Sequence, residues 1–307
     1  MGTRRAAAPT ARRRPRLRGS RSQPRQHRSH LGSIPTGGDL QDLIFRVYPE
    51  AHGRIRSRAM GVLVPLAARR SDRVLVPSTN TRDDLVRLLG VPPEKIDVAP
   101  LGVAMPSGQA SDETDLRTRL QLGDRTVVLT ASAKRPHKNL LRLLDAWVLI
   151  PPDNRPVLVL PGYPTPHEAE LREHAARLGL EADTRFIGWI ADADLEGLYA
   201  VASCFVFPSL YEGFGLPVLE AMARGLPVAC SNRSSLVEVA GQAALLFDPE
   251  DPHAIASAVQ EILRDTATTS RLRAAGYEQA RRFSWSATAQ ATFRTYERAL
   301  ARPPQYS

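Results

Sequence analysis

The feature that most constrains the fold is a regular alternation of short apolar runs with helical patterns in the second half of the chain. Each run is rich in Val, Ile, Leu and Phe and is followed by a segment whose apolar residues recur at helical spacing. Such runs are typical of strands buried on both faces of a parallel sheet, so the sequence predicts an α/β fold. The runs lie at 126–132, 156–162, 184–190, 204–209, 227–230 and 243–249, and the helical patterns at 139–150, 167–178, 192–202 and from about 216.

A shorter stretch of the same kind comes earlier. Residues 54–70 have a helical period, 73–78 have the pattern of a buried strand, and 81–90 predict a helix that Gly90 closes. A second strand followed by a turn is expected at 95–103. This stretch indicates part of a second parallel sheet.

Composition divides the chain into four parts. Residues 1–38 are dominated by Arg, Ser, Pro and Gly and are expected to be unstructured, while a polar, acidic stretch at 106–115 predicts a linker. We therefore assign 39–110 to an amino-terminal Rossmann-like domain, 111–283 to a carboxy-terminal one, and 284–307 to a terminal helix that crosses back to the first domain.

The sharpest motif is PSLYEGFGLPVLEAMARGLPV at 208–228, where a strand ends, a polar loop follows and a helix begins. Pro217 fits the first helical turn, where a missing N–H costs nothing. Gly213 and Gly215 allow the backbone to approach a ligand closely. The free N–H groups and the dipole at the start of such a helix favour a phosphate.

Two carboxylates, Glu212 and Glu220, flank this turn with seven residues between them. Carboxylates accept hydrogen bonds from sugar hydroxyls, often as bidentate acceptors. The alternative is that Glu212 is an ordinary loop charge and Glu220 a first-turn acid that interacts with the helix dipole. The glycines, the proline and the strand-to-helix switch around them favour the binding role.

With these features, the segment resembles the E-x7-E signature of the retaining GT-B glycosyltransferases, in particular glycosyltransferase family 4. The resemblance extends from about Asp39 to Arg298 and includes four further blocks in the same order. It implies two Rossmann-like parallel-sheet domains, of which the first is incomplete here and the second complete. The further blocks are 77–103, 134–147, 179–209 and 281–300.

The resemblance implies catalytic roles for Glu212, which would hold the donor sugar near its reacting face, and for Lys138, which would neutralise the diphosphate leaving group. It places the ribose hydroxyls of the nucleotide on Glu220. Backbone N–H groups of the loop and a nucleobase pocket complete the implied donor-binding set: Ser132, Ala133, Lys138, Gly188, Trp189, Ile190, Glu212, Gly213, Phe214, Gly215, Leu216 and Glu220.

Lys138 has support that does not depend on the resemblance. It is one of three lysines, with Lys95 and Lys134, in a chain with a large excess of arginine. It follows a predicted strand and precedes a helix, where an ammonium can stabilise charge on departing phosphate oxygens. The alternative is a solvated loop lysine, and the neighbouring His137 is interpreted as a polar loop residue.

The chain departs from the family in two places. Many members have Gly-Arg where this chain has Ser132-Ala133, so a phosphate-contacting cation is missing, and Arg135 or Lys134 would have to replace it. Members also carry a His-Asp pair in the first domain, and Gln41 stands where that histidine is expected. Family members have several more strands upstream, for which the preceding residues have neither the length nor the pattern.

Three functional hypotheses follow. The first is an active enzyme that moves a sugar from a nucleoside-diphosphate sugar to an acceptor hydroxyl with retention, in polysaccharide or glycoconjugate synthesis. The second is a nucleotide-sugar-binding remnant without a full acceptor domain. The third is a nucleic-acid binder that acts through its arginine-rich start; without the ten arginines of residues 1–30 the remaining 277 residues have a net charge of −1, which argues against this.

The expected partners are the nucleotide-sugar donor, with GDP-mannose favoured, and a glycan or lipid-linked acceptor. No metal cofactor is expected, because the resemblance gives that role to Lys138 and helix N-termini, and Asp192 or Asp194 is interpreted as a helix cap. Cys204 and Cys230 are expected to be buried thiols in a reducing cytosol. The expected location is cytoplasmic, with peripheral contact at the inner face of the membrane left open, and the arginine-rich start is either an arm for anionic lipid or nucleic acid or a tail without a role.

Overall fold

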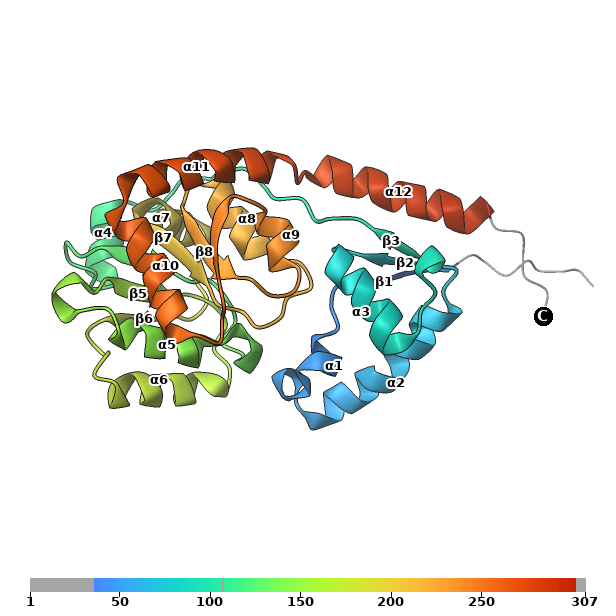
Figure 1. Ribbon diagram of the computed structural model, residues 1–307, viewed down its shortest axis with the longest axis horizontal. Helices are drawn as coiled ribbons and strands as arrows, with labels where there is room; N and C mark the ends of the chain where they lie inside the picture. Colours follow the sequence, from blue (N-terminus) through green and yellow to red (C-terminus); the bar gives the residue numbers. More distant parts are fainter. Residues whose placement is uncertain (1–35, 107, 302–307) are drawn as a thin grey trace, which may run out of the picture. The chain divides into compact units, whose positions relative to one another are not determined.

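Two parallel sheets, each interleaved with helices, make up the fold (Figure 1). The computed structural model describes residues 36–106 and 108–301, and the residues from Pro35 onward belong to one compact unit. The larger sheet, sheet B, has the strand order β6-β5-β4-β7-β8-β9, and all its pairings are parallel. Its strands are β4 (Val127–Leu129), β5 (Val157–Leu160), β6 (Thr184–Phe186), β7 (Cys204–Phe207), β8 (Val228–Ser231) and β9 (Ala244–Phe247).

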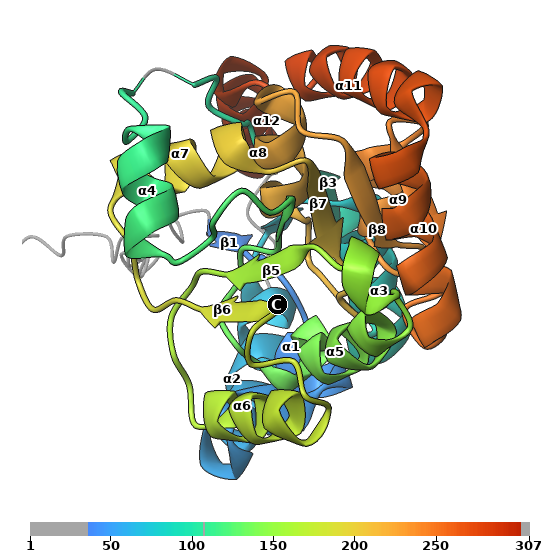
Figure 2. The same cartoon turned by 90° about the vertical axis from the view of Figure 1, so that its left-hand side faces the viewer.

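Helices cover both faces of sheet B, as the continuous apolar runs predicted (Figure 2). One face packs against α4, α7, α8 and α9, and the other against α5, α6 and α10. Because β4, β5, β7 and β8 are buried along their whole length, each strand contributes apolar side chains to both layers. The helices are α4 (Glu113–Arg119), α5 (Leu140–Val148), α6 (His167–Arg177), α7 (Asp192–Val201), α8 (Leu216–Ala223), α9 (Leu236–Ala240), α10 (Pro252–Arg264) and α11 (Thr266–Arg281).

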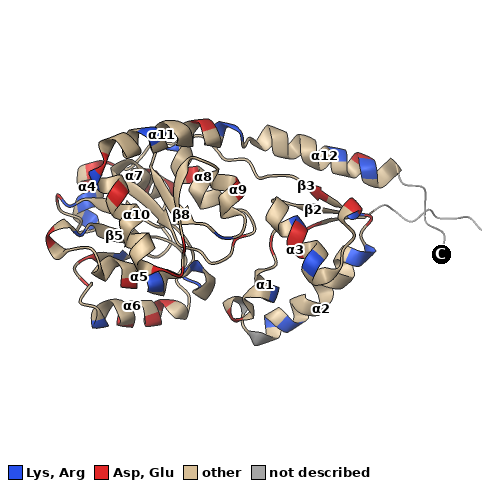
Figure 3. Cartoon of the chain, viewed as in Figure 1, with Lys and Arg blue, Asp and Glu red and all other residues tan. Residues whose placement is uncertain are grey.

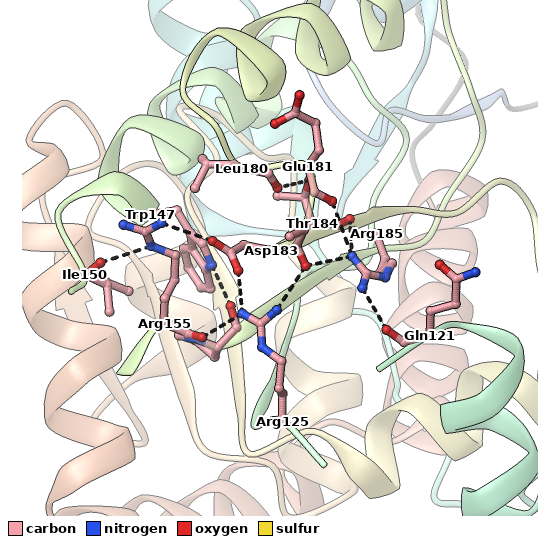
Figure 4. Close-up of polar contacts among 12 residues, drawn as sticks. Gln121, Arg125, Trp147, Ile150, Arg155, Leu180, Glu181, Asp183, Thr184 and Arg185 are labelled. Atoms are coloured by element: carbon pink, nitrogen blue, oxygen red, sulfur yellow. Dashed lines mark hydrogen bonds and ion pairs between the residues drawn. The ribbon is translucent and has the colours of Figure 1, made fainter. Parts of the chain in front are cut away.

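A polar cluster braces sheet B at the amino ends of its strands (Figure 4). Asp183, just before β6, accepts from Arg125 at 2.5 Å and from Arg155 at 3.0 Å. The buried Trp147 of α5 donates its indole N–H to the Pro156 carbonyl at 3.0 Å, just before β5. These bonds hold strand starts and loops together at the edge opposite the one where ligands bind in such sheets.

The smaller sheet, sheet A, has the order β1-β2-β3, also parallel. Its core combines β2 and β3 with apolar residues of α2 and α3, while α12 contacts β1 and β2. The last helix is anchored where the Phe283 carbonyl accepts from Val103 N–H at 3.0 Å and where Thr288 donates to the Pro100 carbonyl at 2.7 Å. The elements are β1 (Gly37–Asp39), α1 (Ile44–Val47), α2 (Arg54–Arg70), β2 (Arg73–Val76), α3 (Thr79–Leu89), β3 (Ile96–Val98) and α12 (Trp285–Ala301).

The structure corrects three expectations. Strand β1 begins at Gly37, inside the segment expected to be unstructured, because its main chain pairs with β2 and needs no apolar side chains to do so. Helix α4 begins at Glu113, within the last three residues of the expected linker, and is capped by Asp112, whose carboxylate accepts from the Asp115 N–H. Helix α7 begins after Ala191 without a side-chain cap, because Asp194 instead binds Ser111 and Arg119. The rest of the arginine-rich segment lies outside the described residues.

Candidate functional site

The topology of sheet B marks one edge for ligand binding. Strands β4 and β7 are neighbours, but the chain leaves β4 toward β5 and leaves β7 toward β8, on opposite sides. A crevice forms outside the carboxyl ends of parallel strands where the order reverses in this way, and nucleotides bind there in doubly wound folds. Lys138 follows β4 and Glu212 follows β7, so both predicted catalytic residues lie beside this switch point.

Lys138 and Glu212 form an ion pair. The Nζ of Lys138 lies 2.6 Å from Oε1 of Glu212, and the two side chains are 15% and 10% exposed. The same ammonium lies 5.2 Å from the ring centroid of Phe207, at the end of β7. Two largely buried charges in direct contact neutralise each other, which avoids the cost of an uncompensated charge in the interior. Removal of either partner therefore leaves an uncompensated buried charge, which a bound ion of opposite sign would have to neutralise.

Side-chain hydroxyls hold the backbone of the loop that carries Glu212. Ser235 donates to the carbonyls of Glu212 at 2.9 Å and Phe214 at 2.7 Å. The Glu212 N–H donates to the hydroxyl of Ser234 at 2.9 Å.

The carbonyl of Gly213, between those of Glu212 and Phe214, accepts hydrogen bonds from side chains that follow β2 of sheet A. Ser78 and Thr81 donate to the Gly213 carbonyl at 2.6 and 3.0 Å. Because three successive carbonyls are engaged, the orientation of their peptide planes is set before any ligand arrives. The loop is therefore preorganised for binding by its main chain.

The two glycines of the motif have different neighbours. Gly215 has φ +112°, in the region that favours glycine, and it is the N-cap of α8, whose first turn contains Pro217 as predicted. A Cβ on Gly213 would lie 2.0 Å from the carbonyl oxygen of Gln41. The close approach at Gly213 is therefore made by the chain itself, at Gln41.

Glu220 lies on α8 in a separate polar setting. Its carboxylate accepts from the hydroxyl of Tyr199 at 3.3 Å, and Arg224 stacks over the Tyr199 ring at 4.8 Å from its centroid. Burial raises the pKa of Glu220, and the charge of Arg224 and the Tyr199 hydrogen bond oppose this rise. Arg224 is itself paired with Glu196 through two hydrogen bonds. The structure thus joins Lys138 to Glu212 and holds Glu220 by other partners.

Of the two cations that the sequence offered in place of the family's arginine, Lys134 is directed into the protein. Lys134 is fully buried and donates to the carbonyls of Gly162 at 2.7 Å and Ile187 at 2.6 Å. Burial lowers the pKa of Lys134 to about 8. Arg135 donates to the carbonyl of Ala51 at 3.1 Å. Lys134 is therefore a structural cation that ties the loops after β4, β5 and β6 together.

The remaining predicted donor residues lie in those loops. The carbonyl of Ser132 lies so close to Gly162 that a Cβ there would be 2.0 Å away, so Ser132 and Ala133 border a tightly packed crossing. The Gly188 carbonyl accepts from Gly162 N–H at 3.1 Å. Next to it, Trp189 is 66% exposed, while Ile190 packs against the core.

No motif in the sequence marks the residues that join this loop to sheet A. The carboxylate of Glu238 accepts from the N–H groups of Thr79 and Asn80 at the start of α3, at 3.2 and 3.1 Å. Tyr211 donates to Asp84 at 2.7 Å. A serine after a strand signals a helix cap, and Ser78 caps α3 in this way. Nothing in its sequence context indicates its second partner, because Gly213 is far away in the chain.

Comparisons with known proteins agree with this architecture. The family model described as "Glycosyl transferases group 1" matches residues 112–279, more than half of the chain, and that described as "Glycosyltransferase Family 4" matches residues 27–105. The O-antigen chain mannosyltransferase B of Escherichia coli is 34% identical over 263 residues, which cover 84% of this chain and 69% of the relative. The D-inositol 3-phosphate glycosyltransferase of Nocardioides sp. is 32% identical over 247 residues, which cover 74% of this chain and 54% of the relative.

Solved structures give the same result. The Anabaena protein Alr3699/HepE, in complex with UDP and glucose, superposes with a TM-score of 0.74 at 25% identity, covering 86% of this chain and 71% of that one. Sucrose-phosphate synthase from Thermosynechococcus elongatus superposes with a TM-score of 0.71 at 28% identity, covering 86% and 68%. The chain therefore belongs to the group 1 glycosyl transferases, with the GT-B architecture and the sequence features of glycosyltransferase family 4.

Proposed function

We propose that this chain transfers a sugar from a nucleoside-diphosphate sugar to an acceptor hydroxyl with retention of anomeric configuration, in polysaccharide or glycoconjugate synthesis. The observation that carries the proposal is the Lys138–Glu212 pair, at the switch point of sheet B and beside the N-terminus of α8. The E. coli relative is a mannosyltransferase by name, which supports GDP-mannose as donor. The Anabaena structure contains UDP and glucose, so UDP-glucose is the alternative donor to test.

The chemistry required of the residues is limited. The acceptor oxygen forms a bond to the anomeric carbon, the bond from that carbon to the diphosphate oxygen breaks, and the acceptor proton leaves with the diphosphate. Lys138 would leave Glu212 and pair with the diphosphate, whose negative charge grows as the bond breaks. Glu212 would then be free to accept hydrogen bonds from the sugar, while the first N–H groups of α8 face the phosphates.

In this scheme Glu220 receives the ribose hydroxyls and the loop containing Gly188, Trp189 and Ile190 receives the base. The exposed indole of Trp189 offers a flat apolar surface for a nucleobase. The charge of the leaving group is assigned to Lys138 and α8, so turnover is expected without added divalent cations and in the presence of EDTA.

A second function is favoured by one feature of sheet A. Its described part has three strands, and Gln41 stands where the family has histidine and contacts Gly213. A protein with a formed donor half and an altered acceptor half would bind nucleotide sugars without transfer.

Donor turnover distinguishes the two functions. Purified protein is incubated with GDP-mannose, UDP-glucose and mixed glycan acceptors, and release of nucleoside diphosphate is measured. We expect release with one donor, loss of at least about a hundredfold in Glu212→Gln, and no change in Glu113→Gln, a control on the exposed surface of α4. Tight donor binding by calorimetry without release under any condition would establish the binding function instead. The anomeric configuration of the product, read by NMR, tests retention.

A further inference from the structure

Helix α2 has two apolar faces, and within residues 36–106 and 108–301 only one of them is covered. Met60, Val64 and Ala68 pack against the core of sheet A. The opposite face is open. Its large apolar side chains are exposed by 87%, 61%, 64% and 44%, in the order Ile55, Val62, Leu63 and Leu66. At about 100° per residue these four fall within an arc of about 100° on the side away from the sheet.

Arginines flank this open face on both sides. The helix has 17 residues, five of which are arginines, and none of which is acidic. By helical position, Arg56 lies on one flank and Arg58 and Arg69 lie on the other, while Arg70 lies at the C-terminal end of the apolar stripe; all four are exposed. Figure 3 shows the basic segments toward both ends of α2. We call the four exposed apolar residues and these four arginines the α2 surface.

We propose that the α2 surface docks onto an anionic lipid bilayer. A helix with an apolar stripe bordered by arginines lies in the plane of a membrane interface, with its apolar side chains below the headgroups and its cations at their phosphates. The stripe from Ile55 to Leu66 is about 16 Å long, which suits a helix lying flat. None of the helices within 36–106 and 108–301 is long and apolar enough to cross a bilayer.

Charge decides between a bilayer and other occupants. A second copy of this chain bound through the same surface would bring two sets of arginines together without acidic partners in either helix. Additional strands beside β1 would widen sheet A sideways, and helices packed on them would lie beside α2 and would not cover its outer face. An anionic membrane matches both the apolar stripe and the excess positive charge.

A hollow at the edge of the α2 surface fits the same partner. It has a volume of about 470 Å³ and is lined by Phe45, Arg46, Arg58 and Val62, among others. Arg46 lies on the exposed surface of α1, which adds a further cation beside the helix. Apolar walls with arginines at the border are suited to the phosphate and upper acyl chain of an anionic phospholipid.

A membrane-docked enzyme would meet a lipid-linked acceptor at the bilayer surface. For an acceptor of that kind, the inference deepens the proposed function. The docking surface itself does not depend on catalysis, because it is defined by α2 alone. Vesicle binding and donor binding are therefore separate measurements, and failure of one does not imply failure of the other.

The first experiment measures co-sedimentation of the full chain with phosphatidylcholine vesicles, with and without phosphatidylglycerol. The ten arginines of residues 1–30 also attract anionic vesicles, so the decisive variant retains every arginine: Ile55→Ser with Val62→Ser and Leu63→Ser. We expect its affinity for anionic vesicles to fall by at least about tenfold, since large apolar side chains no longer enter the membrane. The matched control is Phe293→Ser with Leu300→Ser on α12, whose side chains are 63% and 69% exposed.

A charge variant and a fluorescent probe complete the test. Arg56→Gln with Arg70→Gln should weaken binding by about fivefold for each arginine at low salt. Cys204 and Cys230 are buried, so Val62→Cys can be labelled selectively with an environment-sensitive dye. Its emission should shift to the blue on anionic vesicles, while a dye on Leu246→Cys in β9 should not respond.

Two results would overturn the proposal. The first is equal vesicle binding by the serine variant and the parent chain, which would assign all binding to the arginine-rich segment. The second is a concentration-dependent dimer in sedimentation that the serine variant abolishes, which would assign the α2 surface to a second copy. All substituted positions are exposed. Each variant is verified as folded by an unfolding temperature equal to that of the parent chain.

Discussion

The Lys138–Glu212 pair leads to a prediction in which a double variant recovers stability but does not recover activity. Its atoms are 2.6 Å apart and both side chains are at most 15% exposed, so each charge depends on the other for compensation. Lys138→Met should leave the Glu212 carboxylate without its partner and destabilise the fold by about 3 kcal/mol. Glu212→Gln should leave the ammonium uncompensated and cost a similar amount.

The double variant should recover most of that loss. Met and Gln are both neutral and close in size to the residues that they replace, so no buried charge remains. We expect the two single effects to be non-additive, with a coupling free energy of about 2 kcal/mol or more. Activity should not recover, because the ammonium for the diphosphate and the carboxylate for the sugar are both gone.

Urea unfolding of the four proteins, followed by circular dichroism, gives the coupling free energy, and release of nucleoside diphosphate gives the activity. The Arg177–Glu173 pair on α6, with side chains 56% and 73% exposed, is the matched control and should couple by less than about 0.5 kcal/mol. A coupling near zero for Lys138 and Glu212 would refute the claim that the two charges compensate each other. Recovered activity in the double variant would refute their proposed role in transfer.

Three further predictions test the surroundings of this pair. Ser235→Ala removes the donor to two buried carbonyls and should cost about 2 kcal/mol of stability and weaken donor binding measured by calorimetry. The control Ser203→Ala, on the exposed chain just before β7, should change neither. Because burial lowers the pKa of Lys134 to about 8 from 10.5, the unfolded chain binds more protons between these values and stability should rise with pH across that window; chemical denaturation at several pH values should show this rise reduced in Lys134→Met, and an equal rise in the variant would contradict it. Gly213→Ala places a Cβ 2.0 Å from the Gln41 carbonyl and should loosen the loop from sheet A, seen as faster amide hydrogen exchange at Ser78 and Thr81, with unchanged exchange counting against the contact.

Helix α12 also has exposed apolar residues. Trp285, Phe293, Tyr296 and Leu300 are 52%, 63%, 55% and 69% exposed. An apolar surface of this kind favours association. Sedimentation of the Phe293→Ser and Leu300→Ser control described above will measure its contribution.

Local chemistry determined much of this protein in advance. Apolar runs such as those at β5 and β7 are typical of strands buried on both faces, and Gly90 and Gly179 lie at helix ends in the left-handed conformation, which glycine adopts without a Cβ clash. The position of Lys138 and Glu212 at the ends of two strands followed from the same pattern, because parallel strands deliver their carboxyl ends to one edge.

Tertiary structure alone decided the rest, because it depends on contacts between residues far apart in the chain. Ser78 reaches Gly213 across 135 positions, and Lys134 is buried under two loops although a lysine beside an arginine indicates a surface. Strand β1 exists because its main chain pairs with β2, and among the residues that the structure describes the outer face of α2 is exposed because sheet A packs against the opposite side. Sequence patterns report what a residue prefers locally, whereas the partner that satisfies a hydroxyl, a buried charge or an apolar face is fixed by the fold.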